Sequence, residues 1–380
     1  MNRREFFVSC AFMTSQPLFS SELPNGSEPE KPLIKKAANI RYQTVRLDLN
    51  HPWVIARGGA DFKENVFVFY EREGITGFGE AAHLTAAGQT AAQTIAGIVK
   101  LVPLYQSSDP WQFDHISQQA KVGHPPAPAR AALDMALMDW IGKKLNIPLF
   151  RLFGMSSDQT PPTSYSIGLD TLEVMKQKTK EAAGYQIIKV KLGRDEDEEI
   201  IKALRLVTDK PIRADANEGW KDREIAIRKI EWLHRYNVEL VEQPLPWHLT
   251  DDHAWLKSRS PIPIIADEAV QQSEDIAAIA GAYSGINVKI MKAGGILESL
   301  RMLQMARAHK MDTMIGCMIE SSLGITAAAH LQSLARWIDL DGCLLLKKDP
   351  FAGARLVEGG WRLQNDPGLG VKAIMTFNAK

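Results

Sequence analysis

The sequence predicts an α/β protein: a parallel barrel of the (β/α)8 type joined to a smaller α+β capping domain. From Thr163 onward, short apolar runs alternate with helix-length stretches, which is the pattern of buried parallel strands joined by helices. Before that point, the chain shows alternating strand patterns followed by helical stretches. With 380 residues, the chain is long enough for one large domain and one smaller domain.

Residues 1–36 are predicted to form a signal and linker segment outside the fold. Arg3 and Arg4 precede an apolar patch that ends near Met13, and a polar stretch with prolines follows. This order is typical of an export signal, and Arg3-Arg4-x-Phe6 resembles a twin-arginine motif. We therefore expect a periplasmic protein. The alternative is a disordered tail on a cytoplasmic protein.

The capping domain is predicted to cover residues 37–155. Its strands are expected at 38–50, 65–71 and 74–80, and its helices near 87–104, 111–120 and 127–145. The last helical stretch carries apolar residues at helical spacing from Ala131 to Trp140 and is interpreted as core. A loop, residues 51–59, is expected between the first two strands.

The barrel is predicted to cover residues 160–345, and residues 346–380 are expected to return to the capping domain. Its eight strands are expected at 163–168, 186–192, 211–215, 238–242, 263–267, 285–290, 312–318 and 337–341. Helical stretches such as 222–236 and 295–309 lie between them, as parallel strand connections require.

Three acids, Asp215, Glu242 and Asp267, end three successive predicted strands, about 25 residues apart. In a closed barrel these strand ends share one face, where active sites form. Three converging carboxylates repel one another unless a cation lies between them. An all-oxygen set suits Mg²⁺, so we expect one Mg²⁺ per subunit.

Four lysines flank the acids. Strand alternation places Lys189 and Lys191 on the same side of the second strand. Lys289 lies on the sixth strand, which is across the barrel from the second. Lys292 follows three residues later, so alternation predicts that it points the other way, as a supporting residue paired with an acid.

The pattern of these lysines and acids resembles the muconate-lactonizing subgroup of the enolase superfamily, from about residue 37 onward. Trp337-Ile-Asp339-Leu-Asp341-Gly, on the last strand, resembles the Asp-x-Asp pair with which dipeptide epimerases hold the substrate ammonium group. In that family an arginine of the capping loop can bind the side-chain carboxylate of a Glu substrate. Arg57 sits at a matching place, the alternative being a solvated arginine.

The resemblance implies Mg²⁺-dependent epimerisation of dipeptides at the α-carbon of the second residue, through an enediolate. Lys191 and Lys289 are the expected bases on opposite faces, and Lys189 is the expected partner of the substrate carboxylate. A nearby cation would lower the pKa of a lysine base toward neutrality. If Arg57 has the suggested role, the favoured substrate is L-Ala-D/L-Glu, a fragment of murein peptide.

Further residues are expected around the site. Asn217 and Glu268 adjoin the acids and are candidates to support them. Glu320 and Ser321 follow the seventh strand and are candidates to shape the pocket.

Two alternatives stay open. A cycloisomerase or o-succinylbenzoate synthase would use the same metal site, but Asp339 and Asp341 argue against it because those anionic substrates offer no ammonium group. A non-catalytic peptide-binding protein belongs to a different class and would not need two facing lysines. The side-chain preference of the dipeptide and the role of each lysine toward each enantiomer are not fixed by the sequence.

Composition excludes other classes. The formal charge is zero and no basic block suggests nucleic acid binding. No apolar run after the N-terminus is long enough to span a membrane. Cys10, Cys317 and Cys343 have no metal-type spacing, and the last two are interpreted as inert buried thiols. The resemblance implies a homo-oligomer, dimer or octamer, without fixing its size.

Overall fold

The computed structural model describes residues 37–379, except for 56–57 and 86–87. The expected export signal and Arg57 therefore lie outside the described residues. None of the helices in the described part of the chain is long and apolar enough to cross a membrane.

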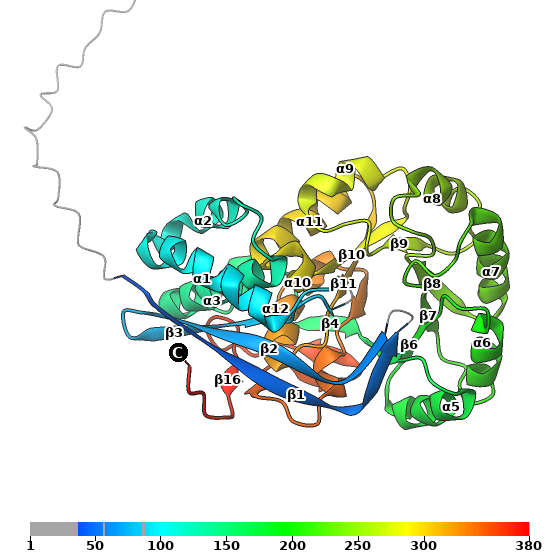
Figure 1. The fold of residues 1–380 in the computed structure, drawn as a ribbon, viewed down its shortest axis with the longest axis horizontal. Coiled ribbons are helices and arrows are strands. Elements are labelled where there is room, and N and C mark those ends of the chain that lie inside the picture. The colour runs from blue at the N-terminus through cyan, green and yellow to red at the C-terminus, as the bar shows by residue number, and fades with distance from the viewer. Residues whose placement is uncertain (1–36, 56–57, 86–87, 380) are drawn as a thin grey trace, which may run out of the picture. The chain divides into compact units, whose positions relative to one another are not determined.

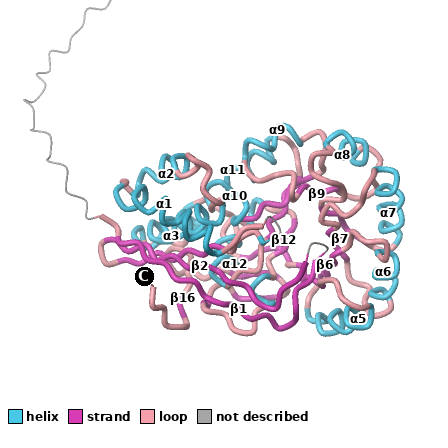
Figure 2. Tube along the Cα trace, in the orientation of Figure 1, coloured by secondary structure: helices cyan, strands magenta, loops and turns pink. Residues whose placement is uncertain are grey.

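Eight parallel strands form the barrel, in the order in which they occur along the chain (Figures 1 and 2). They are β5 (Ser164–Ile167), β6 (Ile187–Lys191), β7 (Ile212–Asp215), β8 (Val238–Glu242), β9 (Ile264–Ala266), β10 (Gly285–Lys289), β11 (Asp312–Gly316) and β12 (Trp337–Asp339). A parallel bridge between Thr163 and Ile338 links the last strand to the first and closes the sheet. The predicted fold class and all eight predicted strands are confirmed.

Helices and short 3₁₀ turns follow the strands and surround the sheet (Figure 2). The helices are α5 (Leu172–Glu181), α6 (Asp197–Arg205), α7 (Arg223–Arg235), α8 (Thr250–Lys257), α9 (Ile276–Ile279), α10 (Ile290–Ala293), α11 (Ile296–Ala308) and α12 (Ser322–Ala329). The 3₁₀ turns are η3 (Ala182–Gly184), η4 (Ser273–Asp275), η5 (Gln332–Leu334) and η6 (Gly342–Leu345). In α7, Asp222 caps the first turn by accepting from Ile225 N, and residues at helical spacing, Ala226 to Leu233, are buried.

The capping domain is an antiparallel sheet of three strands packed against helices. Its strands are β1 (Asn39–Ile55), β2 (Gly58–Arg72) and β3 (Ile75–Ala81), and its helices are α1 (Ala91–Ser107), η2 (Pro110–Gln112), α2 (Phe113–Gln119), α3 (Ala127–Leu145) and α4 (Leu149–Leu152). The α3 helix has the bounds that the apolar spacing predicts. It ends at Asn146, which takes the left-handed conformation common at helix ends.

The loop expected at residues 51–59 is largely absent, and this prediction was wrong. After an irregularity that follows Asp48, β1 resumes pairing with β2 through Trp53, Val54 and Ile55. Aromatic and β-branched residues favour extended pairing, so the hairpin continues beyond Pro52.

Residues after the barrel form short strands. They are β13 (Phe351–Ala352), β14 (Arg355–Val357), β15 (Gly360–Arg362) and β16 (Lys372–Ala373), with β15 pairing to β4 (Gln159–Pro162). The Phe377 ring lies 5.0 Å from Phe69 and 5.6 Å from Phe67 between ring centroids, so the tail packs on the capping sheet.

A buried carboxylate of the capping sheet also binds the barrel. Glu80 on β3 accepts hydrogen bonds from Ser321 N at 2.9 Å and from Gly324 N at 3.0 Å. These are groups of the first turn of α12, which a carboxylate stabilises. The capping domain therefore holds the chain directly after the seventh barrel strand.

Candidate active site

The three predicted acids lie at the carboxyl ends of adjacent strands. Asp215 and Glu242 are the last residues of β7 and β8 and pair directly in register, and Asp267 follows β9 immediately. All three are buried. Burial raises the pKa of Glu242, and the negative charge of Asp215 raises it further. This row of acids needs cations beside it.

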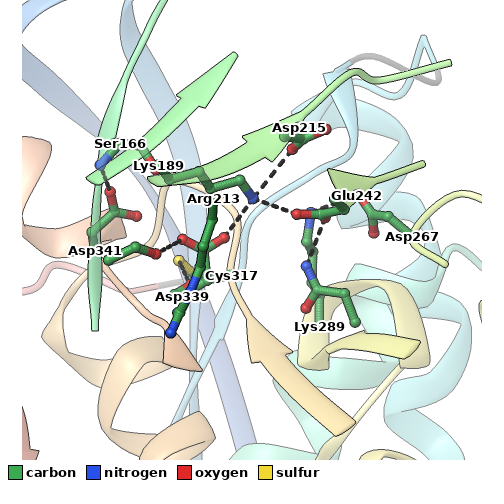
Figure 3. A network of polar contacts seen from close by, with 12 residues as sticks. Ser166, Lys189, Arg213, Asp215, Glu242, Asp267, Lys289, Cys317, Asp339 and Asp341 are labelled. Atoms are coloured by element: carbon green, nitrogen blue, oxygen red, sulfur yellow. Dashed lines mark hydrogen bonds and ion pairs between the residues drawn. The ribbon is translucent and has the colours of Figure 1, made fainter. Parts of the chain in front are cut away.

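Lysine ammonium groups bridge each neighbouring pair of acids (Figure 3). Lys189 Nζ lies 2.7 Å from Glu242 Oε2 and 3.2 Å from Asp215 Oδ2. Lys289 Nζ lies 2.9 Å from Asp267 Oδ2 and 3.9 Å from Glu242 Oε1. The lysines of β6 and β10 therefore enter the acid row from its two ends.

Lys191 contacts Asp215, the acid at one end of the row. Its Nζ donates to Asp215 Oδ2 at 2.5 Å, the same oxygen that Lys189 approaches. The two lysines share one face of β6, as strand alternation predicts.

The charges around Lys189 and Lys289 favour their ammonium forms. Burial alone would lower both pKa values, but nearby carboxylates outweigh it. Asp339 and Glu242 hold the pKa of Lys189 well above its ordinary value, and Asp267 and Glu242 raise that of Lys289. A lysine pKa near neutrality would therefore require another cation to compensate these carboxylates.

The acid row fits a hard divalent cation by its chemistry. Three buried carboxylates from adjacent strands form an all-oxygen donor set of the kind Mg²⁺ prefers. Asn287 Nδ2 donates to Glu242 Oε1 at 2.7 Å and orients that carboxylate. Across the described ranges, no three acidic, histidine or cysteine side chains are already arranged as a metal site. Lys189 and Lys289 neutralise part of the negative charge of these acids, and a bound cation would take over part of that neutralisation.

Lys292 does not point away from the acids, contrary to the alternation argument. The strand ends at Lys289 and the chain turns into α10, where residues three apart share a face. Lys292 Nζ consequently donates to the side chain and the backbone carbonyl of Asp267. It is paired with an acid, as expected of a supporting residue.

The acid pair of the last strand lies beside Lys189. Asp339 accepts from Lys189 Nζ and from Ser164 Oγ, both at 2.6 Å, and Asp341 accepts from Ser166 N at 2.6 Å (Figure 3). Lys189 lowers the pKa of Asp339 against the effect of burial, whereas burial and the Asp339 charge raise the pKa of Asp341 to about 6.

Asp341 differs from Asp339 in its partners. Among the described residues, no lysine, arginine or histidine lies within ion-pair distance of Asp341. A cationic group placed beside Asp341 would stabilise its carboxylate form.

Four further predicted residues lie near this site. Asn217 donates from N to Asp215 Oδ1 at 3.1 Å and from Nδ2 to Glu268 Oε1 at 3.4 Å, and burial with the Asp267 charge raises the pKa of Glu268 to about 7. Burial and the nearby Glu80 raise the pKa of Glu320 to about 8. Ser321 instead caps α12, and its hydroxyl donates to Glu80 at 2.6 Å.

Sequence reasoning assigned no role to Gln243 or Asn287. Gln243 Oε1 accepts from Asp267 N at 3.0 Å and from Ala269 N at 3.2 Å, which fixes the chain that carries Asp267. Asn287 precedes Lys289 by two residues on β10, so strand alternation was a usable signal for it. The role of Gln243 depends on a contact between strands, for which its place next to Glu242 was the only hint.

Two family models match the chain. The model of the mandelate racemase and muconate lactonizing enzyme N-terminal domain matches residues 37–154, and the enolase C-terminal domain-like model matches residues 173–375.

Two named relatives align with most of the chain. An L-Ala-D/L-Glu epimerase of Bacteroides thetaiotaomicron is 40% identical over 98% of this chain and 100% of its own length. A hydrophobic dipeptide epimerase of a Flavobacteria bacterium is 36% identical over 88% of this chain and 99% of its own length.

A solved structure matches the fold closely. The dipeptide epimerase of Enterococcus faecalis V583, in complex with Mg and the dipeptide L-Leu-L-Tyr, superposes with a TM-score of 0.83 at 30% identity, covering 89% of this chain and 99% of that one. By sequence along nearly its whole length and by fold, the chain belongs to the enolase superfamily.

Proposed function

We propose that this protein is a Mg²⁺-dependent dipeptide epimerase, an isomerase that inverts the α-carbon of the second residue. The observation that carries the proposal is the row of three acids entered from opposite strands by Lys189 and Lys289. The epimerases to which the chain is similar, and the similar solved structure of a dipeptide epimerase with Mg and a dipeptide, support the proposal.

In this proposal Asp215, Glu242 and Asp267 hold one Mg²⁺ per subunit. The bound ion supplies positive charge to the substrate carboxylate as the neighbouring carbon loses its proton. Asn287 and Gln243 keep two of these acids oriented. Titration calorimetry with Mg²⁺ would measure the stoichiometry.

Lys191 and Lys289 are the two bases. They come from β6 and β10, which are separated by three strands on either side of the eight-stranded ring. One lysine removes the α-proton from one diastereomer, and the other returns a proton to the opposite face. Lys189, buried among the acids, holds charge and not a transferable proton, because three carboxylates surround its Nζ.

Asp339 and Asp341 take the ammonium group of the substrate. Asp339 is already paired with Lys189, so Asp341 is the carboxylate that gains most from an added cation. A substrate with a carboxylate at one end and an ammonium group at the other, separated by one peptide bond, is a dipeptide.

The favoured substrate is L-Ala-D/L-Glu from murein peptide, with Arg57 as the partner of the side-chain carboxylate. The relatives argue for both acidic and hydrophobic side chains, so the test is a panel. We would incubate L-Ala-L-Xaa dipeptides in D₂O with Mg²⁺ and measure gain of one mass unit.

Fastest labelling of L-Ala-L-Glu is expected, with a loss for Arg57→Met on that substrate alone. Labelling of apolar dipeptides only would refute the acidic preference. Labelling of no dipeptide would refute the function and favour a cycloisomerase.

We further propose that residues 1–36 direct export to the periplasm, where murein fragments arise. Cell fractionation of the full chain should find it in the periplasm, and replacing Arg3 and Arg4 with lysine should retain it in the cytoplasm. A cytoplasmic wild type would refute export.

Sedimentation would give the size of the expected homo-oligomer.

A further inference from the structure

The capping domain holds the segment that directly follows Lys289. This segment comprises the single helical turn α10, the glycine pair Gly294 and Gly295, and the start of α11. Ala82 N of the capping domain approaches Met291 Sδ at 3.3 Å, and both residues are buried. Two residues of α3, Asp134 and Arg130, contact the segment further along.

Asp134 serves as the missing cap of α11. The residue at the helix start is Gly295, which has no side chain to accept a hydrogen bond. Asp134 Oδ2 accepts instead from Ile296 N at 2.5 Å and from Leu297 N at 3.4 Å. A Cβ at Gly295 would lie 2.5 Å from Asp134 Cγ, so glycine is what admits the carboxylate.

Arg130 lies one helical turn before Asp134 and covers the preceding glycine. Its guanidinium carbon would be 2.7 Å from a Cβ at Gly294, whose φ of +90° also favours glycine. The side chains of Arg130 and Asp134 therefore pack directly against two consecutive glycines, Gly294 and Gly295.

The segment that packs against α3 also borders the candidate active site. Only α10, Ile290–Ala293, separates Lys289 from the glycine pair. Within it, Met291 and Ala293 are buried and Lys292 is paired with Asp267. A segment this short and this well packed passes a shift of its anchored end to Lys289.

The other proposed base is held differently. Lys191 is followed by a loop that an acid of the barrel itself fixes, since Asp197 Oδ1 accepts from Gly193 N and Arg194 N, both at 2.9 Å. The two lysines therefore depend on carboxylates from different domains.

We propose that Asp134 is a positioning residue of the capping domain that sets the place of Lys289 but not that of Lys191. The proposal rests on the two-base epimerisation proposed above. It predicts that the loss of the Asp134 carboxylate impairs proton transfer on one face of the substrate only.

The consequence is visible in D₂O. Lys191 removes the α-proton of one diastereomer, its ammonium group exchanges with solvent, and a misplaced Lys289 fails to deliver deuterium to the opposite face. Lys191 then returns deuterium to the face from which it took the proton. The starting diastereomer becomes labelled without inversion. For the other diastereomer, abstraction by Lys289 is itself slowed, so labelling and inversion fall together.

The experiment measures by proton NMR the ratio of the labelling rate to the inversion rate, for both diastereomers of the dipeptide that the wild type labels fastest, which is expected to be Ala-Glu. In Asp134→Ala the ratio should rise at least about tenfold for one diastereomer, since displacing a reacting group by about 1 Å costs on the order of 100-fold. Asp134→Asn keeps an acceptor oxygen and should stay near the wild-type ratio.

Asp139→Ala is the matched control. Asp139 is a buried acid of the same helix that accepts from Phe78 N at 2.9 Å and Leu369 N at 2.8 Å and pairs with Lys143, and none of these partners belongs to the Lys289 segment. Its loss should lower stability and leave the ratio unchanged, because global loosening does not select one face.

The outcomes separate the two proposals. No labelling of any dipeptide of the panel by wild-type protein would overturn the proposed function itself. With an active wild type, an unchanged ratio in Asp134→Ala, or an equal rise in Asp139→Ala, would overturn the positioning role. If Asp134→Ala does not fold, Arg130→Met decides: a rise for one diastereomer supports the proposal, and an unchanged ratio overturns it.

Discussion

Replacing Lys189 with methionine tests whether the acid row depends on this buried cation. Lys189 Nζ lies 2.6 Å from Asp339 Oδ2, 2.7 Å from Glu242 Oε2 and 3.2 Å from Asp215 Oδ2, and its side chain is 3% exposed. Removing one partner of a buried ion pair costs about 3–5 kcal/mol. Three carboxylates lose their common partner here, so we expect the upper end, about 5 kcal/mol.

The assay is thermal unfolding at pH 7.5 with and without Mg²⁺. A loss of about 5 kcal/mol corresponds to a fall in Tm of roughly 10 °C, at about 2 °C per kcal/mol for a large domain. Lys202→Met removes an exposed pair with Glu198 and should change the free energy of unfolding by under about 1 kcal/mol.

Two conditions should reduce the deficit of the Lys189→Met variant. Mg²⁺ compensates the same acids, so it should raise the Tm of the variant more than that of the wild type. The pKa values of the uncompensated acids rise in the folded state, so native protein binds protons more readily than unfolded chain and the deficit shrinks between pH 7.5 and pH 5.5. A Tm loss no larger than that of Lys202→Met, or equal Mg²⁺ responses, would refute the reasoning.

Three further predictions concern single residues. Burial raises the pKa of Asp134 from 3.8 to about 7, so the stability that its protonated form contributes is lost as pH rises from about 4 to 7. In urea unfolding, Asp134→Asn should therefore gain stability relative to wild type over that interval. A difference between the two proteins that does not change with pH would contradict this. Gln243→Met should weaken Mg²⁺ binding roughly 10- to 100-fold by calorimetry, and unchanged affinity would show that the contact with Asp267 N is dispensable. Asp341→Asn should raise the KM for dipeptides more than it lowers kcat. For an N-acetylated dipeptide, which lacks the ammonium group, KM and kcat should be the same in the variant and the wild type.

The arrangement of the barrel was predictable because each strand is a short apolar run at the spacing of a βα unit. The same regularity placed Asp215, Glu242 and Asp267 together, since strand ends share one face of a parallel barrel. Strand alternation also placed Lys189 and Lys191 correctly. These inferences use only local pattern and the closure of the sheet.

Contacts between distant segments could not be predicted in this way. Asp134 looks in the sequence like one polar position of an apolar helix, and only the folded chain brings it to Ile296 N. Lys292 was misplaced because nothing local shows that β10 ends in a helical turn at Ile290. The hairpin beyond Pro52 was missed because pairing with β2 outweighs the local break.

The most direct test of the central claim is proton NMR of L-Ala-L-Glu in D₂O with the protein and Mg²⁺. Two-base epimerisation predicts loss of the Glu α-proton signal together with growth of the L,D diastereomer, and no inversion after Lys289→Met. Growth of the L,D diastereomer without deuterium at the α-carbon, or undiminished inversion by that variant, would contradict it.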